Sequence, residues 1–83
     1  MTAVLLSSLR PGAEATVAEV LAPQQPQDGE LALRLIEIGF LPGERLRVVA
    51  RGQPGDDPIA VRLGHTTFAL RRFEAAFVYV NRV

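Results

Sequence analysis

The sequence predicts a mainly β fold, a small barrel of about five short strands with an α-helix inserted after the first strand and a helical turn before the last. Three observations lead to this prediction. The 83 residues, 48% of them hydrophobic, suffice for one core, so we expect a single domain over residues 1–83. Several short runs alternate apolar and polar residues between Gly and Pro breakers, as strands do. One stretch repeats its apolar residues at helical spacing.

Two Pro-Gly pairs introduce extended segments. Residues 9–12, Leu-Arg-Pro-Gly, precede a strand expected over 13–21, and residues 40–43, Phe-Leu-Pro-Gly, precede a strand that follows them. Proline fixes φ at the second position of a turn and glycine accepts the positive φ of the third, so both pairs predict type II turns. In the first strand Ala15 and Val17 share one face with Glu19, and this imperfect alternation leaves the buried face open.

A helix is expected over residues 29–38. Residues 22–27 before it contain two prolines and three glutamines, which predict a solvated loop. Asp28 suits the N-cap, and Gly39 suits the left-handed end of the helix. Apolar residues recur at i, i+4 and i+7, namely Leu31, Leu35 and Ile38. Leucines also alternate around Leu33, which leaves a strand as the alternative on periodicity alone, but the two caps favour the helix.

A hairpin is expected next. Over residues 45–51 apolar residues alternate with arginines, so we expect Leu46, Val48 and Ala50 to face the core and the arginines mainly to face solvent. The stretch 52–58 carries two glycines and two prolines and predicts a turn. Apolar residues alternate again over 59–63, which completes the hairpin.

The C-terminal part predicts one more hairpin strand, a helical turn and a last strand. A reversal over 64–67 precedes an alternating run that contains Phe68 and Leu70. Residues 71–75 can form one helical turn, and residues 77–80 are the most strand-prone run of the chain. This number and order of elements fit an SH3-like barrel.

Charge and cysteine content exclude several classes of protein. Nine arginines balance nine carboxylates, so the chain lacks the surplus of cations that binding to a polyanion needs, and we expect no nucleic acid partner. Without cysteine there is no disulfide framework and no thiolate metal site. The apolar run at residues 4–6 is too short for a signal peptide or a membrane span, so we expect a cytoplasmic protein without membrane insertion.

No catalytic residue and no cofactor is predicted. Ser7 and Ser8 lie in an expected N-terminal turn rather than at a strand-to-helix elbow, and the glycines form no phosphate-binding motif. His65 is the sole imidazole, and it would hold a metal only if carboxylates such as Asp56 or Asp57 converged on it. We interpret all three as turn residues, with a metal site as the alternative.

Two features are not fully explained by folding. Phe40 and Leu41 are neighbours at a turn, and we interpret both side chains as covering the open end of the barrel, with one of them left exposed as a docking point as the alternative. Arg71 and Arg72 are successive cations that point in different directions. We interpret them as a purely structural pair. The alternative is that one binds a carboxylate such as Glu74 or a loop carbonyl while the other faces a partner.

Four motifs occur in a defined order along the chain. They are Leu-x-Pro-Gly at 9–12, Arg-Leu-x-x-Ile-Gly-Phe-Leu-Pro-Gly at 34–43, Asp-Pro-Ile at 57–59 and Phe-Ala-Leu-Arg-Arg-x-Glu-Ala at 68–75. Each motif alone is common, but in this order and spacing they resemble the ferrous iron transport protein A family, FeoA, over nearly the whole chain. The resemblance implies an SH3-like barrel with a helical insertion and supports the helix over 29–38.

The resemblance also implies a function. Members of this family are small cytosolic accessory proteins of bacterial ferrous iron uptake, thought to act without catalytic residues by contacting FeoB, a membrane transporter with a cytosolic GTP-binding domain. Through such a partner the chain would lie peripheral to the inner membrane. The barrel is also similar to the C-terminal SH3-like domain of iron- or manganese-dependent repressors, so a stand-alone metal-sensing regulatory domain is the alternative.

We hypothesise that a partner contacts the two features singled out above. The residues concerned are Phe40, Leu41, Pro42, Arg71 and Arg72. An RNA-binding module is a third interpretation, because such modules combine aromatic side chains with cations on one sheet face. The aromatic residues near the arginines are Phe68, Phe73, Phe77 and Tyr79. Most of them fall on alternating positions that the core requires.

Overall fold

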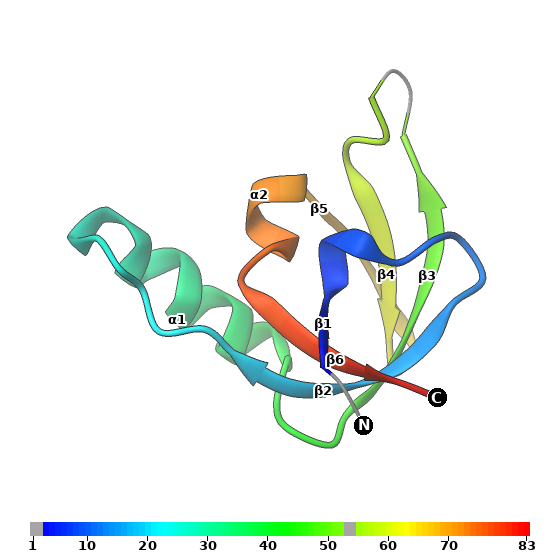
Figure 1. The fold of residues 1–83 in the computed structure, drawn as a ribbon, viewed down its shortest axis with the longest axis horizontal. Coiled ribbons are helices and arrows are strands. Elements are labelled where there is room, and N and C mark those ends of the chain that lie inside the picture. The colour runs from blue at the N-terminus through cyan, green and yellow to red at the C-terminus, as the bar shows by residue number, and fades with distance from the viewer. Residues whose placement is uncertain (1–2, 53–54) are drawn as a thin grey trace.

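Six antiparallel strands form one curled sheet in the order β1-β6-β2-β3-β4-β5 (Figure 1). The computed structural model describes residues 3–52 and 55–83. The strands are β1 (Val4–Leu5), β2 (Glu14–Val20), β3 (Arg45–Arg51), β4 (Ile59–Leu63), β5 (Thr66–Leu70) and β6 (Val78–Arg82). The helices are α1 (Gly29–Ile38) and α2 (Arg72–Ala75), and 3₁₀ turns occupy Leu6–Ser8 and Pro26–Asp28. The mainly β, SH3-like prediction is confirmed.

One hydrophobic core fills the inside of the curled sheet. Its fully buried members come from most elements of the chain: Leu6, Leu9, Ala15, Val17, Leu35, Phe40, Leu46, Val48, Ile59, Val61, Leu70, Ala75, Val78 and Val80. Along β4 and β6 the buried residues alternate with more exposed ones, as predicted, because successive side chains of a strand point to opposite faces. No polar or charged side chain of the described residues is fully buried.

Two β-bulges change which side chains face the core. In β2, Ala15 and Val17 are buried, but the register with β6 shifts between Val17 and Glu19, and Glu19 is exposed. In β3 the register with β4 shifts between Val48 and Ala50. The prediction that Ala50 faces the core is therefore wrong, since the extra residue of a bulge breaks the alternation beyond it.

The helix has the predicted bounds, and the strand alternative for this stretch is wrong. Leu35 is fully buried, with Leu31 and Ile38 half-buried beside it, and Figure 1 shows α1 extending away from the sheet. Gly39 ends the helix at φ 127°. The expected side-chain cap at Asp28 is absent, because a 3₁₀ turn leads into α1 and Asp28 already has helical backbone angles rather than the extended ones of a capping residue.

Both Pro-Gly pairs form the predicted turns. Gly12 and Gly43 have φ values of 92° and 90°, which only glycine accepts readily. The turns close with bonds of 3.0 Å from the Ala13 N–H to the Arg10 carbonyl and from the Glu44 N–H to the Leu41 carbonyl. The two turns therefore have the same backbone form.

The N-terminal strand was not predicted. In β1 only Val4 and Leu5 pair with β6, opposite Val80 and Tyr79, and the chain then enters a 3₁₀ turn. Two residues are too few to show a period in the sequence. The sheet thus has six strands rather than about five, and α1 follows the second strand of the sheet instead of the first.

Candidate functional site

A shallow groove lies between the second Pro-Gly turn and the β4–β5 hairpin. Its volume is about 230 Å³. The residues that line it are Ile38, Gly39, Leu41, Glu44, Leu63, Gly64, Thr66 and Phe68. The two segments touch at the base, because a side chain at Gly39 would meet Leu63 Cδ2 at 3.2 Å. We call this hollow the Leu41 groove.

The two apolar neighbours of the turn have opposite surroundings. Phe40 is fully buried, whereas Leu41 keeps 46% of its surface exposed. The Phe40 N–H donates to the Leu35 carbonyl at the end of α1, so its backbone and its side chain both hold the helix end against the core. The side chain of Phe40 is therefore not available to a partner, and from this turn Leu41 and the exposed Pro42 remain as contact candidates.

The two candidate arginines stand where β5 leads into α2. The Arg72 guanidinium donates to the Gly55 carbonyl at 3.4 Å, and the Arg72 backbone N–H donates to Asp57 Oδ1 at 3.1 Å. These bonds tie the start of α2 to the β3–β4 loop. The Arg71 side chain is exposed and, within the described residues, has no hydrogen bond or acidic partner.

Glu74, the expected partner of one of the two arginines, has other contacts. Its Oε1 accepts a hydrogen bond of 2.7 Å from the Arg71 backbone N–H, which caps α2, and its Oε2 pairs with Arg34 of α1. The Glu74 carboxylate is thus already engaged twice. Of the two arginines, Arg72 holds the loop carbonyl and Arg71 faces solvent.

The candidate metal ligands are not brought together. His65 is exposed in the β4–β5 turn, whereas Asp56 and Asp57 lie in the β3–β4 loop at the opposite end of β4. A strand of five residues separates its ends by about 17 Å, far beyond the reach of one metal ion. Among residues 3–52 and 55–83 no three metal-binding side chains cluster. Asp57 instead binds the Arg72 backbone N–H.

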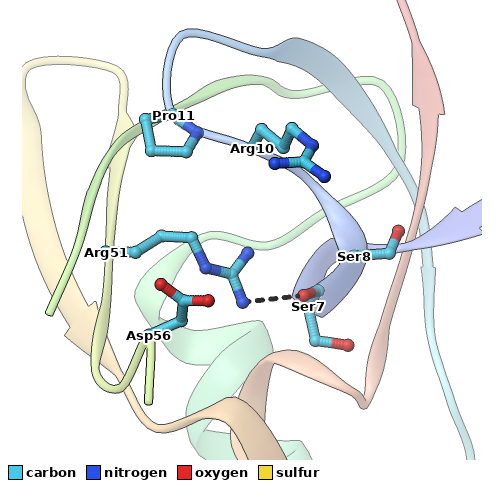
Figure 2. Close-up of a pocket in the computed structure, with 6 residues that line it drawn as sticks. All are labelled: Ser7, Ser8, Arg10, Pro11, Arg51 and Asp56. Carbon is cyan, nitrogen blue, oxygen red and sulfur yellow. Dashed lines mark hydrogen bonds between the residues drawn. The ribbon is translucent and has the colours of Figure 1, made fainter. Parts of the chain in front are cut away.

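A polar pocket of about 360 Å³ between the N-terminal segment and β3 was not predicted (Figure 2). Its central residue is Arg51, whose guanidinium donates to the Ser7 carbonyl at 3.2 Å and to the Leu9 carbonyl. Because the bulge in β3 shifts the alternation, Arg51 turns inward and is half-buried, against the expectation of an outward arginine. Arg51 thus fixes the N-terminal segment to the sheet through two backbone carbonyls, while its buried Nε has no hydrogen-bond partner among the described residues.

The aromatic residues considered for RNA binding do not form one stacking face. Phe73 of α2 is 64% exposed, whereas Phe68, Phe77 and Tyr79 are half-buried. Phe77 packs against the core, but none of the four is fully buried, and in β6 the alternation buries Val78 and Val80 instead. The prediction that the core requires most of these aromatic residues is therefore wrong. The stacking platform that single-stranded RNA needs is therefore not formed by these four side chains.

Comparison with known proteins assigns the fold just described. The family model of the FeoA domain matches residues 4–82, nearly the whole chain. The chain belongs to the FeoA domain family. No curated protein sequence matches it. The family match covers the turn of Leu41, the β4–β5 hairpin and the arginines that follow it.

Solved structures of FeoA proteins have the same fold. FeoA of Stenotrophomonas maltophilia, solved with zinc and described as a prokaryotic SH3 domain protein and a candidate ferrous iron transport activating factor, is 41% identical, with a TM-score of 0.82 over 94% of this chain and 89% of that one. A crystal structure of an iron uptake regulatory protein, FeoA, is 26% identical with a TM-score of 0.79, covering 99% of this chain and all of that one.

The fold also occurs inside a larger regulator. A manganese-dependent transcriptional repressor in complex with manganese is 27% identical to this chain, with a TM-score of 0.81. The match covers all of this chain and 38% of the repressor.

Of the helices described here, none is long and apolar enough to cross a membrane.

Proposed function

We propose that this FeoA-family protein is a non-enzymatic interaction module of ferrous iron uptake that binds the cytosolic part of a FeoB-type membrane transporter and modulates it. On this proposal the protein works in the cytoplasm, held at the inner membrane by its partner. The exposure of Leu41 carries the proposal. Leu41 is 46% exposed and lines the groove together with Ile38, Leu63 and Phe68, so these apolar side chains are grouped in one hollow rather than scattered singly.

The surroundings of Leu41 support a protein partner. The Leu41 groove is small and open, lined by side chains such as Ile38, Leu63 and Phe68, and its one acidic residue is Glu44. Such a hollow fits one or two side chains of another protein rather than a whole metabolite, since pockets for small molecules usually enclose most of their ligand. The exposed Arg71 at the other end of β5 adds a charged contact that could fix the orientation of the partner.

Binding to the soluble cytosolic region of the transporter, and separately to the full-length transporter in detergent, tests the proposal. We expect binding in at least one format, and we expect Leu41→Glu to weaken it while the thermal unfolding temperature stays unchanged, because a loop tip tolerates a charge and an apolar contact does not. No binding in either format at about tens of micromolar would contradict the proposal. Unfolding of Leu41→Glu would instead identify Leu41 as part of the core.

A second candidate function is a metal-sensing regulatory domain, favoured by the similarity to the manganese-dependent repressor. It would require His65 to act with Asp56, Asp57 or a terminal carboxylate. Calorimetry with Fe²⁺ or Mn²⁺ distinguishes the two functions, since a saturable one-to-one site that is lost in His65→Ala would establish the sensor. The separation of His65 from both aspartates by the length of β4 favours the interaction module.

A further inference from the structure

The outer edge of β5 presents backbone groups without a strand partner. β5 pairs with β4 on one side, from Leu63 opposite Thr66 to Ile59 opposite Leu70, and it stands last in the sheet. Because hydrogen-bonded and non-hydrogen-bonded pairs alternate from the two-residue turn at 64–65, the N–H and C=O groups of Thr67 and Ala69 point away from β4. Both residues are exposed.

This edge lacks the features that usually prevent edge-to-edge pairing. Natural edge strands are commonly short, charged, bulged or interrupted by proline. The opposite edge, β1, follows this rule, since it has two residues and then turns into a 3₁₀ segment. β5 has five residues, Thr-Thr-Phe-Ala-Leu, without charge or proline, and its register with β4 is regular. It is therefore a ready template for another strand.

The two contact candidates lie at the two ends of this edge. Thr66 and Phe68 line the Leu41 groove, so this groove flanks the beginning of β5. The strand then runs behind β4 to the start of α2, where Arg71 is exposed without an acidic partner among the described residues (Figure 1). One extended segment laid along β5 would contact both.

We propose that an extended segment of the partner protein adds to β5 as a further strand, with an apolar side chain in the Leu41 groove beside Phe68 and an acidic side chain on Arg71. Strand addition obtains its affinity from main-chain hydrogen bonds and its specificity from side-chain pockets along the edge. The acidic and apolar residues of the segment then lie on opposite faces of the added strand, because Phe68 and Arg71 are three positions apart. This inference rests on the proposed function, which supplies the partner.

The charges along β5 favour a different protein over a second copy of this chain. Two β5 strands paired antiparallel about Phe68 would exchange bonds between Thr67 and Ala69, and they would set Arg71 of one copy opposite His65 of the other. His65 offers no carboxylate, so the exposed Arg71 would remain unpaired. A partner segment with an Asp or Glu at that position satisfies it through a charge-assisted hydrogen bond.

Binding of the transporter's soluble cytosolic region to ¹⁵N-labelled protein tests the inference. We expect the Thr67 and Ala69 amides to exchange rapidly in the free protein and to become protected in the complex. Thr67→Pro removes one outward N–H without touching the β4 ladder, and we expect it to weaken binding about tenfold. The matched variant Thr67→Val keeps the N–H and is expected to bind within about twofold of the wild type. Arg71→Glu is expected to weaken binding, and to do so less at high salt.

The other possible results of the binding and amide-exchange experiment each decide between strand addition and the alternatives. If the wild type binds but both amides stay unprotected, or Thr67→Pro binds as well as the wild type, strand addition is wrong while the proposed function stands. If the free protein dimerises with increasing concentration and protects the same two amides, the edge serves a second copy and the inference is overturned. If the wild type binds neither the soluble cytosolic region nor the full-length transporter in detergent, the proposed function fails and the inference fails with it. Should Thr67→Pro not fold, the amide protection of the wild type alone decides.

Discussion

The two Pro-Gly turns share one backbone form and differ in the side chains at their first and fourth positions. In the first turn (residues 10–13) and the second turn (residues 41–44), glycine has nearly the same φ, and the closing hydrogen bonds are both 3.0 Å long. A fully buried residue precedes each turn, Leu9 in one case and Phe40 in the other. At the first position of the turn, however, stands Arg10 in one case and Leu41 in the other, and both are exposed.

The turns also have matching places in the sheet. Each continues the β2–β3 pairing beyond its ladder, since the Gly12 N–H donates to the Val48 carbonyl at 2.7 Å and the Gly43 N–H donates to the Val17 carbonyl at 2.8 Å. The first turn therefore shows that an arginine is accepted where the second carries an exposed leucine. The backbone therefore does not require an apolar residue at this position, which is compatible with the proposed contact between Leu41 and a partner.

The largest effect is expected in the buried residues that precede the turns. Phe40→Ala should lower the free energy of unfolding by about 3–5 kcal/mol and Leu9→Ala by about 2–5 kcal/mol, because each leaves a cavity in a packed core. Urea unfolding of both variants measures this. A loss below about 1 kcal/mol at Phe40 would show that the second turn rests on the core less firmly than the first.

The two glycines should respond alike. Gly12→Ala and Gly43→Ala are each expected to lower the free energy of unfolding by about 1–2 kcal/mol, because an L-residue is strained at φ near 90°. No neighbouring atom lies within 4 Å of the added Cβ at either site, so the backbone alone sets the cost. A difference of more than about 1 kcal/mol between the variants, measured by urea unfolding, would break the equivalence of the turns.

Exchanging the side chains at the first turn position separates folding from binding. Leu41→Arg and Arg10→Leu should each change the free energy of unfolding by no more than about 0.5 kcal/mol, since both positions are exposed. Titration with the transporter's soluble region should show about tenfold weaker binding, equivalent to about 1.4 kcal/mol, for Leu41→Arg alone. If both variants lost binding affinity equally, the two turns would not differ in their role in binding.

The smallest effect is expected at the prolines. Pro11→Ala and Pro42→Ala should each lower the free energy of unfolding by about 0.4–1 kcal/mol, because proline restricts the unfolded chain and both side chains are exposed in the folded one. Thermal unfolding of both proline variants measures this change in the free energy of unfolding. Pro42 would have a packing role in the second turn alone if Pro42→Ala lowered the free energy of unfolding by several kcal/mol while Pro11→Ala left it unchanged.

Local patterns predicted most elements, and the failures within the sheet have non-local causes. The bounds of α1, both turns, the hairpin strands and the helical turn of α2 follow from spacing and from residues with fixed backbone preferences. The bulges of β2 and β3 depend on the partner strand, so the exposed Ala50 and the inward Arg51 had no local signal. The two-residue β1 forms because β6, far along the chain, offers it an edge.

The candidate site was predicted in part. The sequence left open whether Phe40 and Leu41 both cover the barrel or one of them stays exposed. Which of the two is buried depends on the end of α1 and on the core beneath it. The expected arginine contact with a loop carbonyl occurs, whereas Glu74 pairs with Arg34 from a distant helix. The free edge of β5 has no sequence signal, because a strand is an edge only by its place in the sheet.

The sequence by itself determined where the chain turns, where its helix begins and ends, and which class of fold can bury its apolar residues, because proline, glycine and hydrophobic periodicity act over a few residues. Tertiary structure alone decided which apolar neighbour of the second turn is left in solvent and that His65 and the two aspartates stay apart. It also decided that, among the described residues, no strand pairs with the outer side of β5. The reason is that burial and strand pairing are set by residues distant in the chain, which meet only when the sheet curls around its core.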